Sequence, residues 1–309
     1  YLLCIEMTIM SSTATEKDNS CINKEDEKHI TCTDDMKNMT ITCTEQLVNV
    51  DVCANCGKEG SDLNVCNKCK AAKYCNAACK KKHRTKHKKK CERRAAEIQA
   101  ELHEEQLFEQ PPLKEDCPIC MLPLPSLDTG SKYKVCCGKE ICSGCIHAVK
   151  LRDNGVGLCP FCRTPTPTSE EEMIEMYKKR VEVGDAEAIF GLGCCYSEGL
   201  YGMTRDRAKA LELWQQAGEL GCAEAYGNIG NVYHLGSDVE RDEKKATHNY
   251  ELAAMRGHVS ARFNLGNAEA RAGNWDKALK HFMIAAGSGD NDSVKNIQQM
   301  YMEGHATKE

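Results

Sequence analysis

The spacing of the cysteines constrains this chain more than any other feature of its sequence. Of its 309 residues 22 are cysteine, and 15 of these fall in two clusters between residues 53 and 162. Most stand in close pairs, a spacing that presents two thiolates to one metal ion. The opening residues lack the basic start, long apolar core and cleavage site of a secretion signal. Because disulfides persist mainly in secreted chains, the pattern predicts zinc sites instead.

The first cluster, residues 51–92, contains enough ligands for two tetrahedral zinc ions. Two of its ligand pairs are separated by three residues, which is about one helical turn, so each pair is expected on one helix face. The spacing alone leaves two ways of dividing the eight ligands between the ions. The candidate ligands are Cys53, Cys56, Cys66, Cys69, Cys75, Cys79, His87 and Cys91.

In every spacing this series resembles the MYND-type zinc finger. The resemblance implies interleaved sites, in which Cys53, Cys56, Cys75 and Cys79 hold one ion and Cys66, Cys69, His87 and Cys91 hold the other. It also implies docking of a short proline-rich peptide. Lys80 and Arg84 stand where that family often has Gln and Trp, so an acidic peptide is the alternative ligand.

The second cluster, in residues 116–164, contains eight cysteines and resembles a RING-type zinc finger. The resemblance implies one site of Cys117, Cys120, Cys142 and Cys145 and another of Cys136, Cys137, Cys159 and Cys162. Lys139 occupies the position of the usual histidine ligand and cannot bind zinc, so the adjacent Cys136-Cys137 pair is the expected replacement. His147 is the reserve ligand if Cys136 points away.

RING fingers carry no catalytic side chain, and they act by positioning a ubiquitin-loaded conjugating enzyme. The resemblance implies that Ile119, Pro160 and Arg163 form the docking surface. The alternative is a RING-like fold that serves protein contact without ligase activity. No phosphate-binding loop, carboxylate pair or nucleophile motif points to another enzyme class.

The last part of the chain, residues 169–304, contains internal repeats. Glycines recur at positions 184, 221, 257 and 289, and an aromatic residue recurs as Trp214, Tyr250 and Phe282. We expect two helices per repeat, with the aromatic residue filling the gap between neighbours, and a closing helix over 291–302. The third copy has a shortened turn between its helices. The pattern resembles the Sel-one-like repeats, relatives of tetratricopeptide repeats, which implies a scaffold for protein partners.

The remaining segments are connecting or charged. Residues 1–50 carry an acidic excess equal to the whole net charge of −5 and are expected to be disordered. Residues 93–115 are expected to be a helical linker, exposed as far as Phe108 and stopped by Pro111-Pro112. The basic run 80–94 is open to three interpretations: a solvated face, a nuclear-import signal or a nucleic-acid contact. The chain starts with Tyr, so Met7 and Met10 are candidate true starts.

These observations predict a multi-domain protein with two small zinc-stabilised α+β modules followed by an all-α helical-repeat solenoid. We expect about four zinc ions per chain. The predicted function is a protein-interaction adaptor with RING-type ubiquitin-ligase activity, acting inside the cell on substrates chosen by the repeats. The alternatives are a non-catalytic zinc scaffold and a nucleus-associated regulator that uses the basic run. The expected partners are proteins, with nucleic acid disfavoured by the acidic net charge and a membrane by the lack of a long apolar stretch.

Overall fold

A computed structural model describes residues 30–33, 42–45, 51–127, 130–152, 157–236 and 238–307. The chain divides into two compact units, Tyr1–Gln99 and Ala100–Glu309. Most of the acidic tail lies outside the described residues. Within it, β1 (Ile30–Thr33) and β2 (Thr42–Glu45) pair antiparallel. Disorder was predicted for the whole tail, so these strands were missed, although their Thr and Ile residues favour extended backbone.

The first unit contains the first cysteine segment, residues 51–92, and the start of a long helix. β3 (Asn64–Val65) pairs antiparallel with β4 (Lys73–Tyr74), and α1 (Ala77–Leu107) follows. The side chain of Asn76 accepts a hydrogen bond from the Cys79 amide at 2.9 Å, which caps the start of α1. Residues 93–107 of the predicted linker 93–115 therefore continue the finger helix, whereas residues 108–115 are not helical. Leu107 is buried, although the linker was expected to be exposed as far as Phe108.

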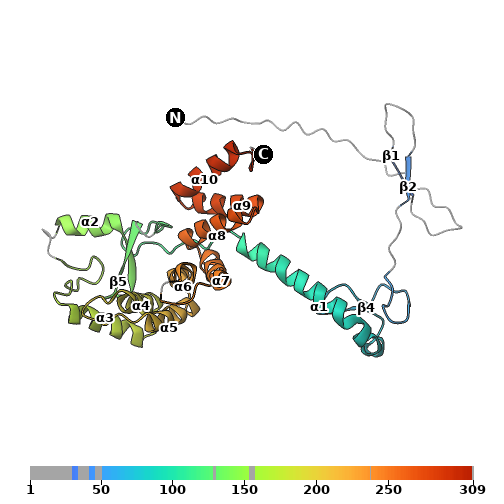
Figure 1. The fold of residues 1–309 in the computed structure, drawn as a ribbon, viewed down its shortest axis with the longest axis horizontal. Helices are drawn as coiled ribbons and strands as arrows, with labels where there is room; N and C mark the ends of the chain where they lie inside the picture. The colour runs from blue at the N-terminus through green and yellow to red at the C-terminus, as the bar shows by residue number, and fades with distance from the viewer. Residues whose placement is uncertain are drawn as a thin grey trace. The chain divides into compact units, whose positions relative to one another are not determined.

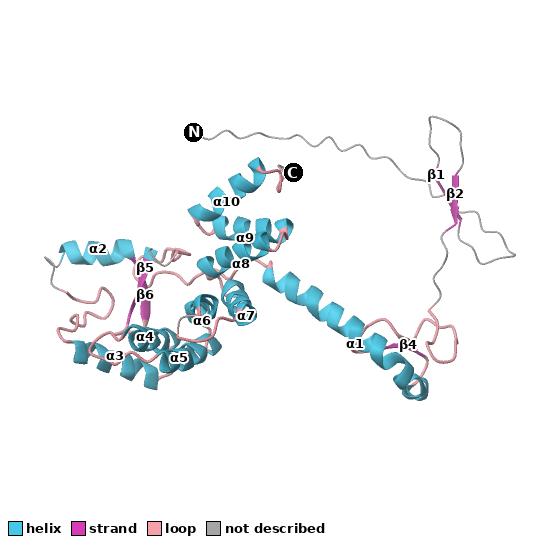
Figure 2. Ribbon diagram, viewed as in Figure 1, coloured by secondary structure: helices cyan, strands magenta, loops and turns pink. Residues whose placement is uncertain are grey.

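The second unit contains the end of α1 and then the second cysteine segment, residues 116–164 (Figure 2). β5 (Ser131–Lys134) pairs antiparallel with β6 (Lys139–Cys142), and α2 (Ser143–Arg152) follows directly. Its small core contains Leu124 and Ile141 together with two of the cysteines. A core of this size cannot hold the segment together without the metal-ligand bonds.

The rest of the second unit is a stack of antiparallel helix pairs (Figure 1). The second helix of each pair packs against the first helix of the next pair, which is the arrangement expected of a solenoid. The helices are α3 (Glu170–Glu182), α4 (Ala186–Glu198), α5 (Arg207–Glu219), α6 (Ala223–Leu235), α7 (Glu243–Met255), α8 (Val259–Arg271), α9 (Trp275–Gly287) and α10 (Asn291–Met302).

The helix boundaries follow the local signals in the sequence. The side chain of Ser169 accepts a hydrogen bond from the Glu172 amide at 3.2 Å, which is the first bond of a capping box. The Glu172 carboxylate accepts from the Thr168 amide at 2.9 Å, one residue earlier than the motif implies. The predicted closing helix is α10, and three residues separate α8 from α9, which confirms the shortened turn.

Each repeat is held together by a glycine that faces an aromatic ring. Gly193, Gly230 and Gly266 lie on the first helices, and a Cβ atom at these positions would lie 2.7, 2.5 and 2.6 Å from Trp214, Tyr250 and Phe282. All three rings are buried. The predicted aromatic therefore packs directly on the backbone of its partner helix, and glycine is needed because any side chain would push the two helices apart.

We expect Gly230→Ala to lower the free energy of unfolding by about 1–3 kcal/mol, because the added methyl group would overlap the Tyr250 ring. Gly287→Ala is the control, since a Cβ atom there meets nothing within 4 Å. The control should be neutral or slightly stabilising, as alanine favours helix more than glycine. Thermal unfolding followed by circular dichroism measures both, and equal effects would contradict this account.

Candidate functional site

In the first cysteine segment, eight side chains form two groups of four. The donor atoms of Cys53, Cys56, Cys75 and Cys79 all lie within 4.8 Å of one another, and so do those of Cys66, Cys69, His87 and Cys91. Helix α1 supplies Cys79, His87 and Cys91, and the loops before it supply the other five. These are the interleaved sets that the resemblance to MYND fingers implies.

The separations between donor atoms identify the kind of bond that these groups can make. The Cys75 Sγ atom lies 3.6 Å from the Sγ atoms of Cys56 and Cys79, and the Cys69 Sγ atom lies 3.3 Å from His87 Nε2. Two sulfur atoms at tetrahedral corners around zinc are about 3.8 Å apart, because each Zn–S bond is about 2.3 Å. Disulfide sulfurs would lie about 2.05 Å apart. The donor set and its spacing fit zinc.

The pKa values of these thiols diverge within one group. Hydrogen bonds, the most important of them with the Cys75 backbone, lower the pKa of Cys53 to about 6. By contrast, hydrogen bonds with Cys79 and Cys56 raise the pKa of Cys75 to about 12. One thiolate therefore forms readily, and the next is opposed by its negative charge. A divalent cation removes that opposition, so metal binding and folding of the segment are coupled.

The second cysteine segment brings eight cysteines together in the same way. The two groups are Cys117, Cys120, Cys142 and Cys145, and Cys136, Cys137, Cys159 and Cys162. The Sγ atoms lie 3.8 Å apart in Cys120–Cys142, 3.9 Å apart in Cys137–Cys159 and 3.4 Å apart in Cys136–Cys162. Both members of the adjacent Cys136-Cys137 pair thus face the same site.

These groups contain neither Lys139, which occupies the usual histidine position, nor the reserve ligand His147. Lys139 begins strand β6, and His147 is exposed on α2. Within the described ranges, no metal-ligand group contains His147. The turn between the strands is tight, because Gly138 has a φ of +66° and both Cys137 and Gly138 donate to the Lys134 carbonyl. This turn aims the adjacent cysteines into the group.

Four of the Cys-x2-Cys pairs share one backbone turn, which sequence reasoning missed. In each, the residue after the second cysteine has a left-handed conformation and its amide donates to the carbonyl of the first cysteine at 2.9–3.0 Å. A non-glycine residue there costs about 1–2 kcal/mol. The metal-ligand bonds must offset this cost. These residues are Gly57, Lys70, Met121 and Arg163.

The three residues expected to dock a conjugating enzyme lie on or beside these turns. Ile119 lies inside the first turn of the second segment and is 38% exposed. Pro160 is half-buried, and Arg163 is exposed in the left-handed conformation at the end of the last turn. Phe161, between them, is 46% exposed. The surface of the two turns therefore presents apolar side chains and one cation.

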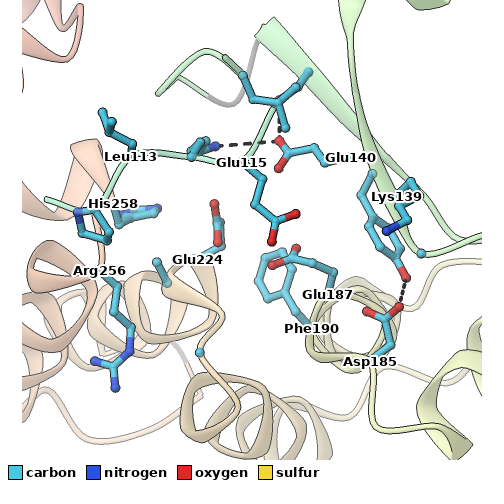
Figure 3. A pocket seen from close by; sticks show the side chains of 18 of the residues that line it. Leu113, Glu115, Lys139, Glu140, Asp185, Glu187, Phe190, Glu224, Arg256 and His258 are labelled. Carbon is cyan, nitrogen blue, oxygen red and sulfur yellow. Dashed lines mark hydrogen bonds and ion pairs between the residues drawn. The ribbon is translucent and has the colours of Figure 1, made fainter. Parts of the chain in front are cut away.

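A cavity of about 770 Å³ lies between the second cysteine segment and the first two repeats. Figure 3 shows the carboxylates of Glu115, Glu187 and Glu224 pointing into it from different elements. At one wall the Tyr133 hydroxyl donates to Asp185 at 2.8 Å. The Asp185 carboxylate also accepts a hydrogen bond from Arg180. Because Asp185 is the N-cap of α4, its bond with Tyr133 joins the second cysteine segment to the first repeat.

Burial within this cavity changes the chemistry of Glu187. Desolvation, followed by the nearby Glu224 charge, raises the pKa of Glu187 from 4.5 to about 7. The thiol of Cys222 lies beside both carboxylates, and burial raises its pKa as well. The sequence around Cys222 contains no local pattern that would predict its grouping with the two glutamates.

Comparison with protein families assigns two parts of the chain. Residues 53–91 match the MYND finger, and residues 186–222 and 223–258 each match the Sel1 repeat. Residues 53–91 are a MYND finger, and the first two helix pairs are Sel1 repeats.

Several known proteins are similar to parts of the chain. The protein named ERAD-associated E3 ubiquitin-protein ligase component HRD3B of Arabidopsis thaliana is 29% identical over 113 residues, covering 36% of this chain and 18% of the relative. E3 ubiquitin-protein ligase GW2 of Oryza sativa subsp. indica is 36% identical over 75 residues, covering 21% and 17%. The chain thus spans about a fifth of the length of these relatives.

Among solved structures, a Sel1 repeat protein from Oxalobacter formigenes is 31% identical, with a TM-score of 0.41 over 43% of this chain and 56% of that chain. Within the described part of the chain, no helix has the length and apolar character needed to span a membrane.

We expect His87→Ala to lower the zinc content by about one ion per chain, because His87 supplies the one nitrogen donor of its group. His83→Ala is the matched control: His83 lies one helical turn earlier, stacks on the His87 ring at 5.6 Å and bonds Tyr74 instead of a cysteine. Metal analysis of the purified variants distinguishes them, and equal zinc loss from both would contradict the assigned ligand set.

The raised pKa of Glu187 predicts a pH-dependent stability. The folded state favours the protonated carboxyl, so this group costs stability as the pH rises from 4.5 to about 7. Glu187→Gln should therefore raise the free energy of unfolding by about 1–2 kcal/mol at pH 8 and leave it unchanged at pH 4. The exposed Glu182→Gln should change neither value. Denaturant unfolding at the two pH values tests this, and a Glu187→Gln effect independent of pH would refute it.

Proposed function

We propose that this protein is a zinc-binding adaptor in which residues 116–164 act as a RING-type finger. In this proposal the finger recruits a ubiquitin-conjugating enzyme, and the repeats hold the substrate. The domains are a MYND finger at 51–92, a helical linker at 93–115, the RING-type finger and a repeat solenoid at 169–304.

The observation that carries the proposal is the interleaving of the second cysteine segment. Its first pair of cysteines groups with the third, and its second pair groups with the fourth. This crossed arrangement holds two loops at a fixed separation without a large apolar core. A rigid two-loop surface is what positioning a conjugating enzyme requires, because the catalytic gain comes from orientation.

The exposed residues of that surface support the same function. Ile119 offers an apolar contact, Pro160 lies within the opposite loop, and Arg163 places a cation at its edge. Two curated relatives are named as a ubiquitin ligase and a component of one, although each match covers a small part of the relative.

The position of the cavity supports substrate selection by the repeats. The cavity is lined by the second cysteine segment on one side and by α4, α6 and the start of α8 on the other. A partner held there by the repeats would lie beside the finger. Transfer to a lysine of that partner would then be favoured by proximity.

We further propose four zinc ions per chain, two in each cysteine segment, and a peptide-binding role for the MYND finger. Lys80 and Arg84 are exposed on α1, which favours an acidic peptide over an apolar one. The protein would work in the cytoplasm or nucleus, where conjugating enzymes are available and thiols stay reduced.

Autoubiquitination with a panel of conjugating enzymes tests the ligase proposal. The unaltered chain should be active with at least one enzyme. Ile119→Ala should abolish that activity, because it removes a docking contact. The variant should retain about four zinc ions, because Ile119 is not a zinc ligand. Met302→Ala is the control, since this exposed apolar residue lies on α10, far from all the cysteine groups in sequence.

A zinc-loaded chain that is inactive with every conjugating enzyme would contradict the ligase proposal and leave a non-catalytic scaffold. A zinc content near two ions would instead contradict the assignment of one cysteine segment.

A further inference from the structure

The buried Arg262 of α8 marks an unusual contact in the third repeat. Its side chain is 2% exposed, and its guanidinium donates to the Leu107 carbonyl at the end of α1 and to the Ala254 carbonyl at 2.8 Å. It forms no ion pair with a carboxylate of the described residues, and burial lowers its pKa to about 10. The carbonyl at the negative end of a helix dipole partly compensates the buried charge.

The side chains of Leu107 and Phe108 pack against the third repeat near Arg262. Leu107 is buried with the solenoid core, and the Phe108 ring lies 4.7 Å from the ring of His281. His281 is 1% exposed, its Nδ1 atom has no hydrogen-bond partner, and burial lowers its pKa to about 3. The neutral imidazole therefore packs against the Phe108 ring, and Lys280 Nζ lies 5.1 Å from the centre of the same ring.

Two pairs of polar side chains lie near these contacts. Lys277 Nζ lies 3.0 Å from Glu104 Oε2, and His103 Nε2 lies 3.2 Å from Glu251 Oε2. His103 and Glu104 precede Leu107 by four and three residues, so both lie on the face of α1 that carries Leu107. The end of α1 thus presents an acidic side chain, an apolar anchor and an aromatic ring to matching groups on α7, α8 and α9.

The third repeat differs from the first at the positions that receive α1. Aligned on the repeated glycine and aromatic residues, Arg262 corresponds to Ile189, and His281 corresponds to Leu213. Ile189 and Leu213 are buried apolar core residues in the first repeat. Replacing them with a buried cation and a buried imidazole destabilises a core unless a ligand satisfies these groups.

We propose that the third repeat is a peptide-binding site whose occupant in this structure is the chain's own segment 103–108. The site recognises a helix end of the form Glu-x2-Leu-Phe, which a partner protein with an acidic residue, a leucine and an aromatic ring in this register would match. Such a partner binds by displacing the end of α1. The tether holds the internal segment at a high effective concentration, so the site is closed in the isolated protein.

A labelled peptide covering residues 97–112 tests this proposal on the full-length chain. Leu107→Ala combined with Phe108→Ala removes the internal anchors and should open the site. The opened chain is expected to bind the peptide at least about tenfold more tightly than the unaltered chain. Leu102→Ala, an exposed position on the same helix, should leave the site closed.

Two further changes in the opened chain identify the site. Arg262→Leu, which restores the apolar kind of residue found in the first repeat, should abolish peptide binding. Lys277→Glu should weaken binding, and a peptide with Lys at the position of Glu104 should recover it. Equal binding to the opened chain with and without Arg262→Leu, or no binding to a folded opened chain, would overturn the proposal.

If the opened chain does not fold, a charge exchange provides a separate test. Glu104→Lys and Lys277→Glu should each speed hydrogen exchange of the amides in residues 103–108, and the double variant should restore slow exchange. Unchanged exchange in both single variants would overturn the proposal. The inference does not rest on ligase activity: a chain inactive with every conjugating enzyme can still bind the peptide, and the reverse also holds.

Discussion

The need to bring four soft donors within bonding distance of one ion controls both cysteine segments. In the first segment, Cys53, Cys66, Cys69 and Cys91 are buried together with Tyr74, so the ligands themselves form most of the core. The hydrophobic effect of so few side chains cannot offset the ordering of about forty residues. Metal-ligand bonds must supply the difference. In the two cysteine segments together, these bonds also hold three non-glycine residues, Lys70, Met121 and Arg163, in the left-handed conformation.

The solenoid depends on a different constraint, the close approach of two helix backbones. Glycine on the first helix of each repeat makes room for the aromatic ring of the second, and the rings are buried as a result. The helix pairs formed in this way pack against the next pair along the chain, so the stack extends without a central core. The repeats differ in which other parts of the chain they contact. The first two line the acidic cavity together with the second cysteine segment, and the third contacts the end of α1.

Together these two constraints suit an adaptor. Small metal-bound modules present rigid loops, and the solenoid presents long surfaces between helices. The second cysteine segment is joined to the first repeat through Tyr133, Arg180 and Asp185, so a partner at the cavity meets both. Asp185 performs two tasks there, because its carboxylate also caps α4 through the Ala188 amide.

The sequence by itself determined the local and periodic features. Ligand spacing predicted the membership of all four metal-ligand groups once the family resemblances were applied, and repeat periodicity predicted the helix pairs and α10. These features depend on residues close in sequence or on a recurring register. Only the tertiary structure determined which residues distant in sequence contact one another and how those contacts change their pKa values. Arg262 meets Leu107 across 155 positions, and burial, followed by the nearby Glu224 charge, raises the pKa of Glu187 to about 7. Burial and charge at such sites arise when distant segments pack, so no local pattern encodes them.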